Sequence, residues 1–261
     1  MNATDPALMQ YLVAQQTVTQ PAKTPDYGDR LRLGMILPNR NIVAENDAQA
    51  ILPAGVSIHT TRLKLHGTTA EDILGMSAGA ESAAKLLGPA PIDLIVFHCT
   101  AVSTHDPLMG DSLVKRIEDA SGKPAMATSQ ALVAAFETLH AKRIVMLTPY
   151  EQSVNDAEVR FCAHYGVEVL HEIGLQLPAE VSTASVSEQE WFDRAVAMKN
   201  PEADAYFLSC TNIKCISVIA ALEHVLEAPV ITSNQAMLWH ALRKCKILDK
   251  ISGYGTLLQS Y

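Results

Sequence analysis

Two cysteine residues stand at matching positions in two similar stretches of the chain. Asp93-Leu-Ile-Val-Phe-His-Cys99-Thr100 corresponds to Asp204-Ala-Tyr-Phe-Leu-Ser-Cys210-Thr211, with a displacement of 111 residues. Each cysteine ends an apolar run typical of a buried strand and precedes a loop that leads into a helical stretch. Because ligands bind beyond the carboxyl ends of parallel strands, both thiols are expected at a ligand site. Nearby backbone N–H groups would lower the thiol pKa and favour the thiolate.

A pair of thiols on opposite sides of one small substrate can perform two kinds of chemistry. One thiolate can remove a proton from one face of a carbon while the other thiol returns a proton to the opposite face. Alternatively, a thiolate can add to a double bond and leave again after rotation. A lone cysteine at a strand end is usually a packing residue, so the matched position of Cys99 and Cys210 is what favours function.

The other three cysteines, Cys162, Cys215 and Cys245, have no counterparts and lie in helical stretches, so we interpret them as core or surface thiols. The Cys210–Cys215 spacing is poor for zinc, and no metal site is predicted. His98 is expected to be buried and structural. His105, in the loop after Cys99, could equally tune the thiol or be passive.

The elements that must position these thiols also repeat. Arg32–Pro38 corresponds to Arg143–Pro149, again with a displacement of 111 residues, and Thr128–Leu132 corresponds to Thr232–Met237 with a displacement near 105. Three matched pairs in the same order predict an internal duplication. The predicted strands are 31–37, 56–63, 94–98, 143–147, 167–173, 205–209 and 229–232. The predicted helices are 69–87, 111–120, 131–140, 155–165, 188–198, 216–226 and 236–245.

This alternation of strands and helices predicts an α/β fold, with parallel sheets covered by helices on both faces. We divide the chain into an N-terminal extension (1–29), a first α/β half (30–140) and a second half (141–261). A C-terminal segment of the second half could return to the first. The two halves are expected to be pseudo-symmetric, with the active site in the cleft between them.

Composition limits the classes of partner. The chain has 261 residues, 48% of them hydrophobic, and a formal net charge of −8 without a basic run. These features argue against nucleic acid or an anionic membrane as a partner. The first residues do not resemble a signal peptide, and no apolar stretch approaches the ~18 residues of a membrane span. The expected location is therefore cytoplasmic, and the oligomeric state is left open, a homo-oligomer included.

Several segments together resemble a known group of enzymes. These are Gly34-Met-Ile-Leu-Pro-Asn-Arg-Asn41, Thr60-Thr-Arg-Leu-Lys-Leu-His66, Cys99, Leu147-Thr-Pro-Tyr150 and Cys210. Their order and spacing resemble the aspartate/glutamate racemase superfamily, in particular the branch with maleate cis–trans isomerase, ectoine-utilisation proteins and arylmalonate decarboxylase. The resemblance extends from about Leu31 to Leu258. It implies two Rossmann-like αβα domains that hold the carboxylates of a substrate between them.

The resemblance also implies roles for single residues. In the isomerase, the first cysteine is the nucleophile that adds to the double bond and the second carries a proton, which assigns these catalytic roles to Cys99 and Cys210. The site asparagine and tyrosine of the family correspond to Asn41 and Tyr150. Beside the thiols, three further residues are expected to bind the carboxylate: Thr100, Thr211 and Asn212.

The sequence thus predicts an isomerase or racemase that acts on a small carboxylate or dicarboxylate without metal or organic cofactor. A decarboxylase-like lyase that uses Cys210 as proton donor is the first alternative. Arylmalonate decarboxylases carry glycine at the first cysteine position, so Cys99 speaks against this alternative. The second alternative is a carboxylate-binding protein without activity, which the duplicated Cys-Thr pair disfavours.

Overall fold

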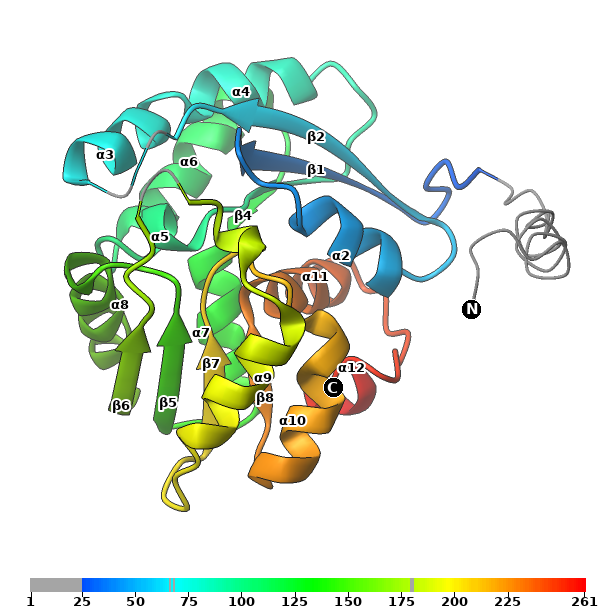
Figure 1. Ribbon diagram of the computed structural model, residues 1–261. Coiled ribbons are helices and arrows are strands. Elements are labelled where there is room, and N and C mark those ends of the chain that lie inside the picture. Colours follow the sequence, from blue (N-terminus) through cyan, green and yellow to red (C-terminus); the bar gives the residue numbers. More distant parts are fainter. Residues whose placement is uncertain (1–24, 66, 68, 179–180) are drawn as a thin grey trace, which may run out of the picture.

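The computed structural model describes residues 25–65, 67, 69–178 and 181–261 (Figure 1). Most of the predicted N-terminal extension lies outside the described residues. Within them, no helix combines the length and the apolar character needed to cross a bilayer.

Within the described residues, eight strands form two parallel sheets of four strands each. The first contains β1 (Leu31–Pro38), β2 (Val56–Leu63), β3 (Leu94–Phe97) and β4 (Ala125–Ala127), in the order β2-β1-β3-β4. The second contains β5 (Arg143–Thr148), β6 (Glu168–Gly174), β7 (Ala205–Leu208) and β8 (Val230–Thr232), in the order β6-β5-β7-β8. The predicted α/β fold with two pseudo-symmetric Rossmann-like halves is therefore confirmed.

The strand registers reproduce the repeat seen in the sequence. In the first sheet Leu33 pairs with Leu94, and in the second Ile144 pairs with Ala205, so both partners are displaced by 111 residues. Ile95 pairs with Ala125, and Tyr206 pairs with Val230, which gives displacements of 111 and 105. Matching registers at both displacements are the structural signature of the duplication, because shared apolar composition alone would not fix the register.

Helices cover the sheets and follow the strands in chain order. In the first half they are α2 (Ala44–Ile51), α3 (Ala70–Ala78), α4 (Ala80–Leu87), α5 (Thr100–Ser103), α6 (Met109–Ser121) and α7 (Thr128–Thr138). In the second half they are α8 (Gln152–His164), η1 (Thr183–Ser185), α9 (Glu188–Ala197), η2 (Ile216–Val218), α10 (Ile219–Leu226), α11 (Ser233–Lys244) and α12 (Thr256–Ser260). β3 and β7 are buried over their whole length, as expected of central strands between two helical layers.

Several elements differ from the prediction, and the helices α2, α5 and α12 were not predicted at all. The single helix expected over 69–87 is divided into α3 and α4 at Gly79, where a Cβ atom would lie 2.7 Å from the Leu63 side chain of β2. The strand β4 was missed because it has only three residues, two of them alanine, which favours helices. Glycine at position 79 therefore allows the close approach of the helical layer to the sheet.

The two halves share one core. Phe136 of α7 packs edge-to-face on Phe207 of β7, with ring centroids 5.7 Å apart, so the last helix of the first half contacts the second sheet. Conversely, α11 packs against both α7 and α2 (Figure 1). The main hydrophobic cluster accordingly contains residues of both halves. The division at residue 140 stays a prediction, since these contacts cross it.

Candidate active site

Both predicted catalytic cysteines line the same cavity. Cys99 and Cys210 each lie two residues beyond the last residue of their strand, β3 and β7, at the carboxyl ends of the two sheets. The cavity has a volume of about 130 Å³ and is formed by the loops after β1, β3, β5 and β7 together with the segment around Leu177–Thr183. Pockets for drug-sized ligands have roughly 300–1,000 Å³, so this cavity suits a small molecule.

Burial controls the ionisation of Cys99. This residue immediately precedes α5 and is only 4% exposed. The N–H group of Val102 lowers the pKa of the thiol, but burial outweighs it and raises the pKa to about 12. Negative charge on Cys210 or Glu158 raises it further. The expectation that the start of a helix would lower the pKa of this thiol was therefore wrong, because desolvation of the thiolate is the larger effect.

Cys210 has more hydrogen-bond partners than Cys99. Its sulfur accepts the N–H of Asn212 at 3.3 Å and lies 4.0 Å from the Thr183 hydroxyl. The pKa of Cys210 is still raised by burial, while hydrogen bonds from the Tyr150 hydroxyl, the Asn212 N–H and Thr183 partly lower it. Of the two thiols, Cys210 is therefore the better supported as a thiolate.

The backbone of Cys210 is strained. Its φ of +142° lies in a region that residues other than glycine rarely adopt. In this conformation the Cys210 N–H donates to Ser233 Oγ at 3.2 Å, and the same oxygen accepts the Thr100 hydroxyl at 2.8 Å. Ser233, at the first position of α11, thus connects the two cysteine loops. The N–H of Cys210 is thus engaged by Ser233.

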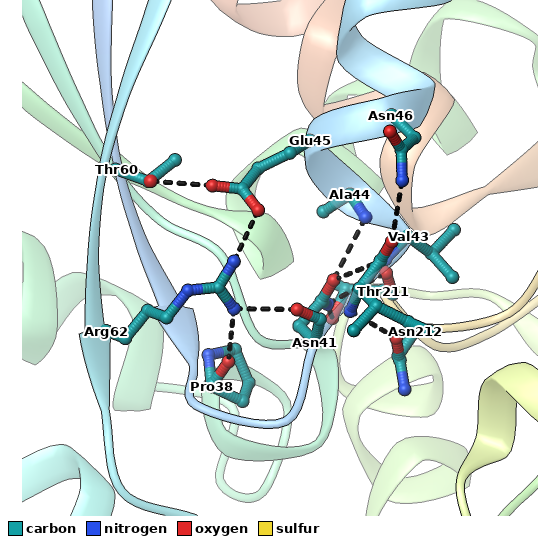
Figure 2. A network of polar contacts seen from close by, with 11 residues as sticks. Pro38, Asn41, Val43, Ala44, Glu45, Asn46, Thr60, Arg62, Thr211 and Asn212 are labelled. Atoms are coloured by element: carbon teal, nitrogen blue, oxygen red, sulfur yellow. Dashed lines mark hydrogen bonds and ion pairs between the residues drawn. The ribbon is translucent and has the colours of Figure 1, made fainter.

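Asn41 joins the two halves beside the cavity (Figure 2). Its Nδ2 donates to the carbonyl oxygen and the hydroxyl of Thr211, at 2.9 and 3.0 Å, and its Oδ1 accepts the N–H groups of Val43 and Ala44 at the start of α2. Arg62 of β2 donates to the Asn41 carbonyl at 2.6 Å and pairs with Glu45. Asn41 lines the cavity, but both ends of its amide are engaged within the protein.

Of the other four predicted substrate-binding residues, three line the cavity and one does not. Tyr150, Thr211 and Asn212 line the cavity. Asn212 also accepts the N–H of Ile42 at 2.9 Å (Figure 2). Burial raises the pKa of Tyr150 well above its ordinary value, so its hydroxyl is a donor at neutral pH. Thr100 is fully buried and is not among the residues that line the cavity, so it supports the loop through Ser233.

The structure adds residues that the sequence did not indicate. Thr183 lines the cavity, and its hydroxyl accepts Asn212 Nδ2 at 3.0 Å. It lies in a segment without a repeat counterpart, so no sequence signal pointed to it. Ser233 could have been found, because it belongs to the third repeated segment. Arg40 lines the cavity as well.

The remaining candidates fall outside the cavity. His98 is fully buried, as predicted, and its Nε2 lies 2.9 Å from Asn234 Oδ1. His105 does not line the cavity. Cys162 and Cys215 are buried and Cys245 is half-buried, all away from the cavity lining. Among the residues that the structure describes, no group of three or more His, Cys, Asp or Glu side chains is arranged to hold a metal ion.

Comparison with known proteins agrees with this geometry. Maleate isomerase from Geobacillus stearothermophilus is 22% identical over 242 residues, which cover 87% of this chain and 96% of that protein. Arylmalonate decarboxylase from Bordetella bronchiseptica is 28% identical over 154 residues, or 56% of this chain and 62% of that one.

Solved structures show the same fold. A mutant of Nocardia farcinica maleate cis–trans isomerase with a covalently bound succinylcysteine intermediate has a TM-score of 0.84 at 20% identity, covering 88% of this chain and 99% of that one. Residues 33–258 match the family model described as arylmalonate decarboxylase. The resemblance inferred from the sequence is thereby confirmed, and the chain belongs to the arylmalonate decarboxylase family.

Proposed function

We propose that this protein is a cofactor-independent isomerase that acts on a small dicarboxylate, in the manner of maleate cis–trans isomerases. The observation that carries the proposal is that Cys99 and Cys210 line one small cavity from equivalent strand ends of a duplicated fold. Similarity to known enzymes supports the proposal, since two maleate isomerases match over 87% of this chain. A decarboxylase relative matches over a smaller share.

In the proposed reaction, the Cys210 thiolate takes the proton of the Cys99 thiol, and the sulfur of Cys99 forms a bond to one alkene carbon. The π electrons move to the neighbouring carbon, where the Cys210 thiol delivers a proton. The former double bond is now single and rotates. Cys210 then takes a proton back, the double bond forms again, and the carbon–sulfur bond breaks to release the trans acid and restore both cysteines. The covalent succinylcysteine in the Nocardia relative is the species that such an addition would give.

Polar groups gather on the Cys210 side of the cavity. Tyr150, Thr183 and Asn212 surround this sulfur, and Thr211 lies next to it. Hydroxyl and amide donors of this kind can hold a substrate carboxylate and stabilise the charge that develops on it during addition. Arg40 supplies a positive charge suited to a second carboxylate. We propose these groups as the substrate-binding set.

Proton NMR in D2O with maleate as substrate tests the proposal. We expect conversion to the trans diacid by the wild-type protein, with deuterium in the product if Cys210 exchanges its proton during turnover. Cys99→Ser should abolish turnover, because serine is a far weaker nucleophile at neutral pH. Cys210→Ser should reduce it by about 10²-fold or more. Cys245→Ser, outside the cavity lining, is the matched control and should keep wild-type activity.

A decarboxylase remains the second candidate, because one wall of the cavity is apolar. Leu65, Ala101, Leu177 and Val181 line it, and they suit a hydrophobic substituent better than a second carboxylate. In that case Cys210→Ser would abolish activity on a malonate, while Cys99→Gly would leave it intact. Maleate turnover lost in Cys99→Ser and malonates left unchanged would exclude the decarboxylase. Binding of maleate without any turnover would instead favour a carboxylate-binding protein.

A further inference from the structure

Two buried carboxyl groups occupy equivalent positions in the two halves. Asp47 on α2 and Glu158 on α8 are 111 residues apart, the displacement that relates Cys99 to Cys210. Asp47 is 6% exposed and Glu158 is 1% exposed, and neither lines the cavity. Acidic side chains are almost never fully buried without a charged partner, so two such carboxyl groups at equivalent positions call for a role.

Glu158 connects the two cysteine loops. Its Oε1 accepts the Ser209 hydroxyl at 2.9 Å and the Thr104 hydroxyl at 3.4 Å. Ser209 directly precedes Cys210, and Thr104 ends the short helix α5 that begins after Cys99. One carboxyl oxygen thus holds both thiol-bearing segments. Oε2 has no hydrogen-bond partner among the residues that the structure describes.

Within the described residues, the side chains whose pKa an ionised Glu158 raises are all acidic. Burial raises the pKa of Glu158 to about 7. The hydrogen bonds from Ser209 and Thr104 lower this pKa, but their effect is smaller than that of burial. The titratable side chains coupled to Glu158 are one tyrosine and three cysteines, from α8 and from the loops after β5, β3 and β7: Cys162, Tyr150, Cys99 and Cys210. On β6, Glu172 faces α8 and accepts hydrogen bonds from Gln152 and Asn155. No ion pair within the described ranges includes Glu158.

We propose that Glu158 is a positioning residue for both thiols, whose protonated carboxyl holds the Cys99 and Cys210 loops together and whose ionisation suppresses the thiolates. The inference rests on the proposed function only in taking isomerisation as the reaction of the two thiols; the effect of Glu158 on their ionisation does not depend on it. The physical basis is the pair of hydroxyl hydrogen bonds at Oε1 together with a buried Oε2 that has no hydrogen-bond partner among the described residues. Burial without a partner destabilises a charged carboxylate far more than a neutral carboxylic acid.

The direction of the effect follows from the order of ionisation. Below about pH 7 the carboxyl is neutral. As the pH rises, Glu158 takes up negative charge before either thiol, because the pKa of Cys99 is about 12 and that of Cys210 is also raised. Each thiol must then ionise beside an existing anion, which moves its titration to higher pH. Removing the charge at position 158 should therefore move both thiol titrations to lower pH.

Site-resolved alkylation measures this shift without any substrate. Rates of iodoacetamide labelling at Cys99 and Cys210 would be followed by peptide mass spectrometry across the alkaline range, in wild type, Glu158→Gln and Asp47→Asn. Glutamine can accept the same two hydroxyls but cannot ionise. We expect Glu158→Gln to lower both midpoints by about one pH unit, the order for a unit charge ~10 Å away at an effective dielectric constant of about 20.

Asp47→Asn is the matched control, because Asp47 raises the pKa of Cys215 and has no such effect on either site thiol. Its midpoints for Cys99 and Cys210 should equal those of wild type. Unchanged midpoints in Glu158→Gln, or an equal shift in both variants, would overturn the proposal.

A second measurement needs no variant and covers the case in which Glu158→Gln fails to fold. In wild-type protein with 13C-labelled glutamate carboxyls, one carboxyl should titrate near pH 7. Titration of every glutamate in the ordinary range refutes the inference. Shifted alkylation midpoints in a protein without isomerase activity would reject the proposed function and leave the role of Glu158 standing.

Discussion

At the scale of single residues, the two thiols differ although the duplication made their positions equivalent. Cys99 has an extended backbone with φ of −151°, whereas Cys210 has φ of +142°. In the strained conformation the N–H of Cys210 donates to Ser233, and the sulfur of Cys210 accepts the N–H of Asn212. Strain of this kind is typical of functional sites and persists only where the surrounding contacts enforce it.

Replacing each cysteine by alanine and by glycine tests the strain. Glycine ordinarily lowers stability relative to alanine by about 0.4–1 kcal/mol, because it enlarges the entropy of the unfolded chain. At position 210 we expect the reverse, with Cys210→Gly more stable than Cys210→Ala by about 1 kcal/mol, since glycine adopts this φ without strain. Urea unfolding measures the difference. The control is position 99, where Cys99→Gly should be the less stable; the same order at both positions would contradict the strain.

At the scale of elements, α11 links the second half to the cysteine loop of the first. Asn234 on α11 donates from Nδ2 to Asp47 at 2.6 Å and to the Thr211 carbonyl at 3.3 Å, and its Oδ1 faces His98 Nε2 at 2.9 Å. The Nε2 atom of His98 therefore carries the hydrogen. Burial lowers the pKa of His98 to about 4, so the ring is neutral at physiological pH.

Removal of the Asn234 side-chain amide should strongly reduce the stability of the protein. Asn234→Ala leaves the His98 N–H and the Asp47 carboxyl without their buried partner, and each loss costs roughly 1–3 kcal/mol. We expect the free energy of unfolding to fall by about 3 kcal/mol in urea titrations. Asn46→Ala, an exposed asparagine that bonds the Ile42 carbonyl, is the comparison and should change stability by no more than about 0.5 kcal/mol. Equal effects of the two changes would mean that the network adds nothing.

At the scale of the whole molecule, the two sheets are parts of one cooperative structure. The contact of Phe136 with Phe207 and the packing of α11 on α7 and α2 place core residues of both halves in a single cluster. The pair of cysteines in the cavity depends on both halves in the same way, since each half supplies one thiol. The site therefore exists only when both halves are folded and docked.

Calorimetry of wild type and Phe136→Ala tests this cooperativity. Removal of a buried phenylalanine side chain costs about 3–5 kcal/mol. If the halves unfold together, the variant should show one heat-absorption peak at a lower temperature, with the calorimetric and van't Hoff enthalpies equal. Leu86→Ala on the exposed face of α4 provides the reference and should hardly move the peak. Two separated peaks would show independent halves.

The sequence by itself determined most strands and the internal symmetry, because apolar runs and repeats are local signals, whereas β4 and the helices α2, α5 and α12 were not predicted. Its displacements of 111 and 105 residues reappear in the strand registers, and the predicted cysteines line one cavity. The 111-residue relation of Asp47 to Glu158 was equally available, but acidic residues in helices are usually exposed and gave no reason to look.

Only the tertiary structure decided the electrostatics of the site. The pKa of Cys99 depends on how completely the folded chain excludes water from it, which no local pattern records. The bond from Asn41 to Thr211 joins residues 170 positions apart, and Thr183 reaches Cys210 from a segment without a repeat. Thr100 was expected to bind the substrate but does not line the cavity. Its hydroxyl instead donates to Ser233 of α11, which is 133 residues later in the sequence.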